Sequence, residues 1–325
     1  MAPHSREAKT LSTEVVLVAG PTASGKSALA LDLAGHLSGV VINADAMQVY
    51  RELRVLTARP DDDAEARAPH RLYGFLPVSE AFSAARWREQ AVAEIRAAHG
   101  AGRLPIVVGG TGLYFKALTE GLSPVPEIPS DVRSRVRARV QELGAEAFHA
   151  ELALKDPAMA TRLRPSDPQR LARAAEVLEA TGTSLAEWQG RASADEGFRF
   201  STFLLLPPRD LLHAACDVRF RAMVGAGALD EARAMRALGL DPALPATRAV
   251  GLRELIRHLD GEIELEEAIT LAQAATRQYA KRQITWFRNQ LHNLTVFNEQ
   301  YSERVRQKIF SKIEASLLTR PESSV

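Results

Sequence analysis

The stretch "VVLVAGPTASGKSALALDLA", residues 15–34, decides the fold of the chain. It reads as a β-branched run, a glycine-rich turn and an amphipathic helix, and residues 20–27 match G-x-x-x-x-G-K-[ST] at every fixed position. In such a P-loop, backbone N–H groups and a helix N-terminus bind an anion, while the lysine reaches the terminal phosphate and the hydroxyl suits Mg²⁺. The predicted phosphate-binding residues are Gly20, Pro21, Thr22, Ala23, Ser24, Gly25, Lys26 and Ser27, with Ser27 also the predicted Mg²⁺ ligand. The pattern predicts a bound phosphate chain without specifying ATP.

The composition is that of a soluble globular protein, with 46% hydrophobic and 25% charged residues among 325. Apolar runs such as residues 203–208 are far shorter than the roughly 20 residues that cross a bilayer, and the first ten residues lack a signal-peptide pattern. The single cysteine, Cys216, excludes an internal disulfide and a multi-cysteine zinc site. We therefore expect a cytoplasmic monomer that binds no membrane.

Charge is distributed unevenly along the chain, although the formal net charge is only +1. Residues 131–139 and 162–173 carry four arginines each, and residues 276–290 carry four basic side chains without an acidic one. A polyanion needs a local basic surface rather than a large net charge. These segments are therefore compatible with nucleic acid binding.

The order of the elements predicts an α/β fold. Short β-branched runs at 15–20, 40–45 and 104–108 alternate with helical periodicity at 26–37 and 84–99, which indicates parallel β/α units. A proline-rich connector then leads into an Arg/Ala/Leu/Glu-rich helical region, after which a buried strand, several helices and a last strand at 294–298 follow. We predict a P-loop core with a parallel sheet flanked by helices, plus an all-helical insertion. The predicted divisions are 11–122 and 199–300 for the core, the latter with the C-terminal helices, 123–198 for the insertion and 301–325 for a C-terminal extension; residues 1–10 and those after 319 are expected to be disordered.

Two polar residues follow predicted strands, where α/β sheets build their sites. Asp45, in "NADAMQVYR", fits a general base, a Mg²⁺ partner or a simple turn cap. Thr111, in "GGTGLY", either directs a hydroxyl at a phosphate or belongs to an ordinary turn. The residues alone leave these alternatives open.

The segment "TRQYAKRQITWFR", residues 276–288, has a helical pattern with two sides. At 100° per residue, Arg277, Lys281 and Arg288 fall within about 40° of one another. The aromatic residues lie on the other side: Tyr279, Trp286 and Phe287. The helix either docks by its aromatic residues and offers cations to a phosphate backbone, or presents an ordinary solvated face.

Five ordered motifs together resemble the bacterial tRNA dimethylallyltransferase family: GPTASGKS, DAMQVY, GGTGLY, DPQR and RQYAKRQITWFR. The resemblance covers residues 14–298. It implies that the P-loop holds the diphosphate of dimethylallyl diphosphate rather than a nucleotide to be hydrolysed. The N6 amine of adenosine 37, next to the anticodon, would then attack the allylic carbon while diphosphate leaves. The anticodon arm of tRNA is the implied partner, and Mg²⁺ the implied cofactor.

The same resemblance implies roles for individual residues. Asp45 matches the general base, Arg219 a cation that stabilises the leaving group, and Thr111 a hydroxyl that contacts phosphate. The target base has to leave its stack to reach the P-loop, so further residues must hold the RNA. The implied tRNA-binding residues are Asp45, Ala46, Met47, Gln48, Thr111, Arg133, Gln169, Arg170, Arg173, Arg248, Gly251, Arg253, Arg277, Lys281, Arg282 and Arg288.

The chain departs from the family pattern at a few positions. Ser27 replaces a threonine and keeps the hydroxyl, Asn43 and Ala46 stand where serines are common, and Leu252 stands where a tyrosine is expected. The departure at Leu252 puts its contact with RNA in doubt. Two other functions remain as alternatives: a P-loop nucleotide or small-molecule kinase, and a noncatalytic tRNA-binding factor that uses the P-loop as a switch.

Overall fold

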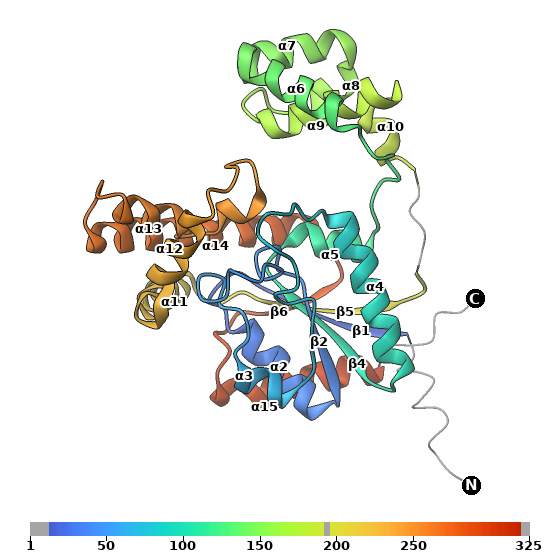
Figure 1. The fold of residues 1–325 in the computed structure, drawn as a ribbon. Coiled ribbons are helices and arrows are strands. Elements are labelled where there is room, and N and C mark those ends of the chain that lie inside the picture. Colours follow the sequence, from blue (N-terminus) through green and yellow to red (C-terminus); the bar gives the residue numbers. More distant parts are fainter. Residues whose placement is uncertain (1–12, 192–195, 320–325) are drawn as a thin grey trace. The chain divides into compact units, whose positions relative to one another are not determined.

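An entirely parallel, six-stranded sheet forms the centre of the larger of two compact units (Figure 1). The structure, a computed structural model, describes residues 13–191 and 196–319. In the order β3-β2-β4-β1-β5-β6, the strands are β1 (Glu14–Ala19), β2 (Gly39–Asn43), β3 (His70–Arg71), β4 (Leu104–Gly109), β5 (Arg199–Leu205) and β6 (Leu294–Phe297). The predicted α/β fold is confirmed. Strand β3 was not predicted, because two residues are too few to show a strand pattern.

Side chains of β1 alternate between two apolar layers, because successive residues of a strand point to opposite faces of the sheet. Val15 and Leu17 share one layer with helices α4 (Ala84–Gly100), α5 (Gly112–Thr119) and α14 (Leu265–Gln290). Val16 and Val18 share the other with α2 (Lys26–His36) and α15 (Glu303–Thr319). Helices on both faces explain why every residue of β1 is buried.

Helix α15 adds to the core where no element was predicted. Ile309 and Ile313, one turn apart, are fully buried in the layer that contains α2. Just before the helix, the Tyr301 hydroxyl donates to Asp32 of α2 at 2.8 Å. The residues expected to be disordered, 1–10 and those after 319, lie outside the described ranges.

A further group of helices packs against the loop that follows β2. The loop continues into α3 (Asp62–Arg67), and the group consists of α11 (Arg209–Met223), the π-helical turn η1 (Val224–Ala228), α12 (Leu229–Ala237), the 3-10 turn η2 (Pro245–Arg248) and α13 (Leu252–Leu259). Their apolar side chains share a core with Tyr50 and Leu53 of the loop. The Glu231 carboxylate of α12 accepts three backbone N–H groups of residues 54–56 at 2.7–2.9 Å. These bonds fix the loop near the carboxyl edge of the sheet.

Residues 120–195 form a second compact unit, whose regular elements in the described part are all helices. They are α6 (Ser130–Leu143), α7 (Ala145–Lys155), α8 (Pro157–Arg162), α9 (Pro168–Thr181) and α10 (Leu185–Gln189). Val132, Val136 and Val140 recur every four residues on α6 and share a core with Leu171 and Val177 of α9. The sequence placed the corresponding boundaries at 123 and 198. Across the described residues of both units, no helix is long and apolar enough to cross a membrane.

Candidate active site

The P-loop connects the end of β1 to the first residue of α2. Gly25 has a φ of 86°, and Ala23 has a φ of 61°, a left-handed conformation that costs a non-glycine residue about 1–2 kcal/mol. Lys26 is buried, and its Nζ donates to the Pro21 carbonyl at 3.2 Å. The lysine charge is thus held within the curve of the loop.

A cavity of about 220 Å³ lies beside the P-loop, within the unit that contains the sheet. Its polar lining comes from Thr22, Lys26, Ser27, Asp45, Gln48, Thr57, Arg219, Arg248, Thr276 and Arg282. The remaining lining comes from Ala46, Met47, Leu56, Cys216, Phe220, Met223, Ala249, Val250 and Tyr279. The cavity can therefore take a ligand that is anionic in one part and apolar in another.

Asp45 reaches the cavity because β2 ends two residues earlier, at Asn43. The buried Asn43 side chain accepts the Asp45 N–H at 2.8 Å and donates to the Asp45 carbonyl at 3.0 Å. Asp45 Oδ1 accepts the N–H of Met47 at 2.9 Å. Asp45 is therefore a turn cap, and this role is compatible with chemistry because a carboxylate has a second oxygen.

Thr111 supports the Asp45 segment from the end of β4 and is not among the residues that line the cavity. Its N–H donates to the Ala44 carbonyl at 3.1 Å, and its Oγ1 accepts the Ala46 N–H at 2.9 Å. Gly109 permits this approach, since a Cβ there would lie 2.1 Å from the Ala44 oxygen. The structure gives Thr111 a positioning contact, and its predicted contact with a phosphate stays a prediction.

Three charged side chains interact across the cavity, although they are far apart in the sequence. The pKa of Lys26 is lowered to about 8, mainly by burial and also by the nearby charge of Arg219, whereas the charge of Asp45 opposes the shift. Burial also lowers the pKa of Arg219, and Asp45 again opposes the shift. One buried and one partly buried cation, together with one carboxylate, thus line a site that favours a polyanion.

The basic residues of α14 have different surroundings. Lys281 and Arg288 are exposed. Arg277 is partly buried and forms an ion pair with Asp217 of α11. The predicted cationic stripe therefore consists of two exposed cations and one ion-paired arginine.

The aromatic residues of α14 have two kinds of surroundings. Phe287 is fully buried and Trp286 packs against the same core, as expected of a docked helix. Tyr279 instead lines the cavity, where Arg282 lies over its ring, 5.6 Å from the centroid. Burial raises the pKa of Tyr279, so its phenol stays protonated. The side of the helix opposite the exposed cations therefore faces the cavity as well as the sheet.

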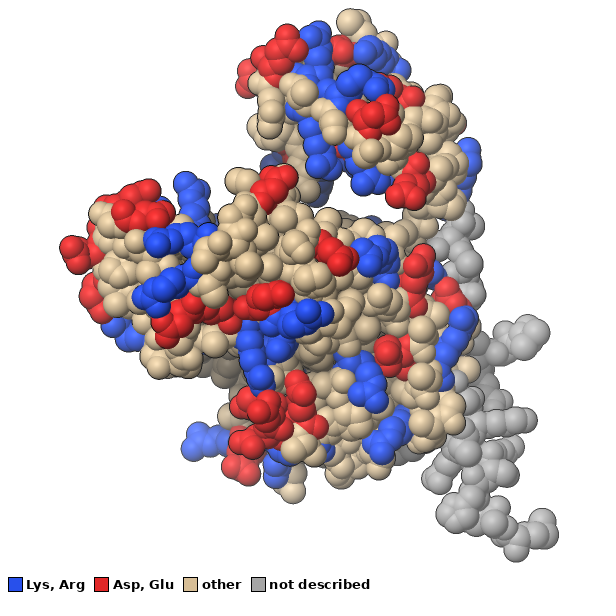
Figure 2. Space-filling view, viewed as in Figure 1, with Lys and Arg blue, Asp and Glu red and all other residues tan. Residues whose placement is uncertain are grey.

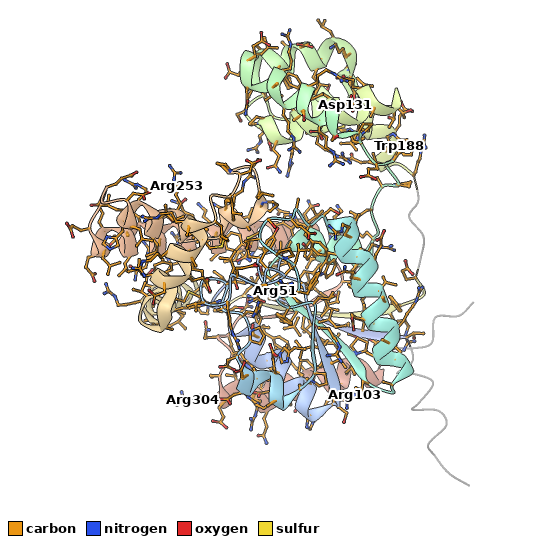
Figure 3. The ribbon with its side chains drawn as sticks, in the orientation of Figure 1. Arg51, Arg103, Asp131, Trp188, Arg253 and Arg304 are labelled. Carbon is orange, nitrogen blue, oxygen red and sulfur yellow. The ribbon has the colours of Figure 1, made fainter. Side chains whose placement is uncertain are left out.

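Residues 248–253 have three different kinds of surroundings. Arg248 lines the cavity, whereas Arg253 is exposed on α13 (Figure 3). Gly251 has a φ of 89°, and a Cβ there would lie 2.3 Å from the Phe220 ring. Leu252 is buried in the core of α11–α14. Gly251 and Leu252 thus have packing roles.

The other candidate tRNA-binding residues, Arg133, Gln169, Arg170 and Arg173, belong to the helical unit. Arg133 lies on α6 and the other three lie in the first turns of α9. Arg170 and Arg173 pair with acidic residues three positions away, at N···O distances of 3.4 and 3.8 Å. Figure 2 shows basic and acidic side chains intermingled on the visible face of this unit, in keeping with such pairs.

Several residues that shape the site were not predicted. Phe220, Met223 and Leu56 line the cavity, but in a sequence such residues are indistinguishable from core. Gln283 contacts the P-loop from α14.

Gln48, which was predicted to bind tRNA, has contacts within its own loop. Its Nε2 donates to the Thr57 and Ala58 carbonyls at 2.9 and 3.0 Å. Contacts of this kind depend on the folded chain and leave no local pattern.

Comparisons with known proteins identify the family of the chain. The IPP transferase family profile matches residues 48–290. The chain is 60% identical to a tRNA dimethylallyltransferase of Rhodospirillum centenum over 85% of this chain and 89% of that one, and 55% identical to one of Parvibaculum lavamentivorans over 94% and 97%. It also resembles the crystal structure of the full-length tRNA isopentenylpyrophosphate transferase from Bacillus halodurans, with a TM-score of 0.68 and 34% identity. The match covers 94% of this chain and 97% of that one. The chain therefore belongs to the IPP transferase family, the family of the tRNA dimethylallyltransferases.

Proposed function

We propose that the protein transfers the dimethylallyl group of dimethylallyl diphosphate to the N6 amine of adenosine 37, next to the anticodon of tRNA, and releases diphosphate. Family membership supports an enzyme that prenylates tRNA. The observation that carries the specific reaction is the cavity, in which Lys26, Arg219 and Asp45 occur together with apolar side chains. Such a lining suits a diphosphate joined to a short hydrocarbon chain.

Lys26 and Arg219 would stabilise the leaving diphosphate. Negative charge grows on the diphosphate as the allylic C–O bond breaks, and fixed cations in a buried site stabilise this charge without reorganisation. A bound diphosphate also favours the charged form of Lys26, because a nearby anion opposes the effect of burial. We infer that Lys26 is protonated in the complex.

Asp45 is the candidate general base. The lone pair of the adenine amine is delocalised into the purine ring, so removal of a proton during attack makes the nitrogen a better nucleophile. As the new N–C bond forms and the allylic C–O bond breaks, the proton passes from N6 to the Asp45 carboxylate. The bond from the Met47 N–H holds this carboxylate in place.

Mg²⁺ fits the site as a partner of the diphosphate rather than of a protein cage. Among the described residues, no group of three His, Cys, Asp or Glu side chains is placed to hold a metal ion. Ser27 and Asp45 supply oxygen atoms to the cavity lining, and Mg²⁺ usually binds one or two protein oxygens together with phosphates. When bound, the ion would neutralise part of the diphosphate charge.

The basic residues outside the cavity are proposed to bind the tRNA backbone. Lys281, Arg288 and Arg253 are exposed, as phosphate contacts require. Arg248 and Arg282 line the cavity that a flipped adenine would have to enter. The basic residues of the helical unit would form a separate contact surface, and the tRNA substrate makes the cytoplasm the expected location.

One reaction distinguishes this function from the alternatives. The protein is incubated with unmodified tRNA, Mg²⁺ and either dimethylallyl diphosphate or ATP, and the digested nucleosides are analysed by mass. We expect prenylated adenosine in the reaction with dimethylallyl diphosphate and none in the reaction with ATP. Consumption of ATP without allyl transfer would favour a kinase, and tRNA binding without any covalent product would favour a noncatalytic factor.

A further inference from the structure

Gln283 of α14 connects two loops of the site. Its Oε1 accepts the N–H of Thr22 in the P-loop at 2.8 Å, and its Nε2 donates to the Gly110 carbonyl at 2.9 Å. The Gln283 side chain is buried, with 5% of the residue exposed. One amide therefore satisfies two backbone groups that belong to different loops.

The P-loop needs such support because its backbone is strained. Ala23, next to Thr22, has a φ of 61°, and a strained residue persists only where the surrounding structure holds it. The bond to Gln283 fixes the Pro21–Thr22 peptide, one residue before Ala23, and the Thr22 side chain lines the cavity. Loss of this bond would allow the loop to relax away from the shape that surrounds a diphosphate.

The glycine-rich turn after β4 is built to let α14 approach. A Cβ at Gly110 would lie 2.1 Å from Gln283 Nε2, and a Cβ at Gly112 would lie 2.0 Å from the Trp286 ring. Between these glycines, Thr111 accepts the Ala46 N–H next to Asp45. A continuous series of contacts thus runs from the P-loop through Gln283 and this turn to the Asp45 segment.

We propose that Gln283 is a positioning residue, which sets the placement of the diphosphate-binding loop relative to the segment that carries the general base. It acts through Thr22 and Gly110 and touches no reacting atom. The inference rests on the proposed function. It explains a buried glutamine that neither phosphate binding nor tRNA binding otherwise requires.

The test compares two substitutions in the full-length protein. Gln283→Ala removes the amide and most of the side chain, whereas Gln283→Met keeps nearly the same length and volume without the two hydrogen bonds. We expect both to raise KM for dimethylallyl diphosphate roughly tenfold and to lower kcat by a similar factor, because each leaves two backbone groups, the Thr22 N–H and the Gly110 carbonyl, without their buried partner. The Kd for tRNA should stay within about twofold, since the exposed cations of α14 are unchanged.

Gln273→Ala is the matched control. Gln273 lies on the same helix, and its Nε2 donates to the Asp217 carbonyl at 2.9 Å, away from both loops. We expect parental kinetics from this variant, with all proteins assayed well below the lowest melting temperature. Parental kinetics from Gln283→Met would show that only side-chain volume matters and would overturn the proposal, as would a rise confined to the Kd for tRNA.

Calorimetry with inorganic diphosphate separates this inference from the proposed function. If the parent protein makes no prenylated adenosine, the proposed function fails, but the P-loop still binds an anion whose affinity can be measured. Weaker diphosphate binding to Gln283→Met than to the parent and to Gln273→Ala supports the positioning role. Equal binding by all three proteins contradicts it.

Discussion

Replacement of Asp45 by Asn should abolish most of the chemistry while leaving the fold in place. Asn keeps an oxygen that can accept the Met47 N–H, now 2.9 Å from Asp45 Oδ1, so the turn after β2 should persist. We expect the free energy of unfolding to change by less than about 0.5 kcal/mol, as for substitutions that keep packing and hydrogen bonds. The variant loses only the negative charge and the capacity to accept a proton.

The loss of charge has two effects of different size. Without a general base, the chemical step should slow by at least about 10²-fold, which corresponds to roughly 2.7 kcal/mol of activation free energy. Asp45 also opposes the lowering of the Lys26 pKa, so this pKa, about 8 in the parent, should fall further in the variant. The assay should therefore be run at least about one pH unit below the parental pKa of Lys26, with dimethylallyl diphosphate saturating.

Single-turnover prenylation of tRNA measures the chemical step directly, and thermal melting and diphosphate binding serve as controls. A rate within about threefold of the parent would remove Asp45 from the mechanism and leave the proton to water or to the departing diphosphate. A variant that melts early or loses diphosphate binding would instead identify Asp45 as a structural residue or a Mg²⁺ ligand.

Three other outcomes are expected. Neutralising Lys281 and Arg288 together should weaken tRNA binding and reduce the slope of log affinity against log salt by about 0.7–0.9 per lost phosphate contact; an unchanged slope in filter binding would mean a solvated face. In a pH series, KM for dimethylallyl diphosphate should rise as the pH passes about 8, because Lys26 loses its proton above its lowered pKa, and a flat profile would contradict this. Gly110→Ala should lower the melting temperature and raise the same KM as Gln283→Met does, because its Cβ would lie 2.1 Å from Gln283 Nε2; parental values would show that the turn yields without consequence.

The fold was predictable because its signals are local. The apolar run of β1, the P-loop and the first turns of α2 follow one another within 20 residues, and the alternation of strands with helices already implies a parallel sheet. The pattern that buries Ile309 and Ile313 is also present in the sequence, but the apolar layer that they join is built from α2 and from strands β1 and β5, which lie roughly 100 to 300 residues earlier in the chain. Local periodicity identifies an apolar face without identifying its neighbour.

The site was predictable to a smaller extent, for the same reason. Lys26 and Asp45 follow strands of a parallel sheet, so their convergence at one edge follows from the fold. The role of Arg219 came from a family resemblance, since a helical arginine has no distinguishing pattern of its own. The phosphate contact of Thr111 also came from the resemblance and stays a prediction. The glycines around Thr111 are explained by close contacts with Ala44, Gln283 and Trp286.

Helix α14 shows how one segment serves both the sheet and the site. Its inward face consists of Thr276, Ala280, Gln283 and Phe287, three or four residues apart and all buried. Packing alone would favour an apolar residue at position 283, between the buried Ala280 and Phe287, and a glutamine there is costly unless both ends of its amide are satisfied. Both ends are satisfied, by one backbone group from each loop of the site. A buried glutamine between the apolar Ala280 and Phe287, with its partners on two loops of the site, indicates that this position contributes to the arrangement of the site as well as to the stability of the fold.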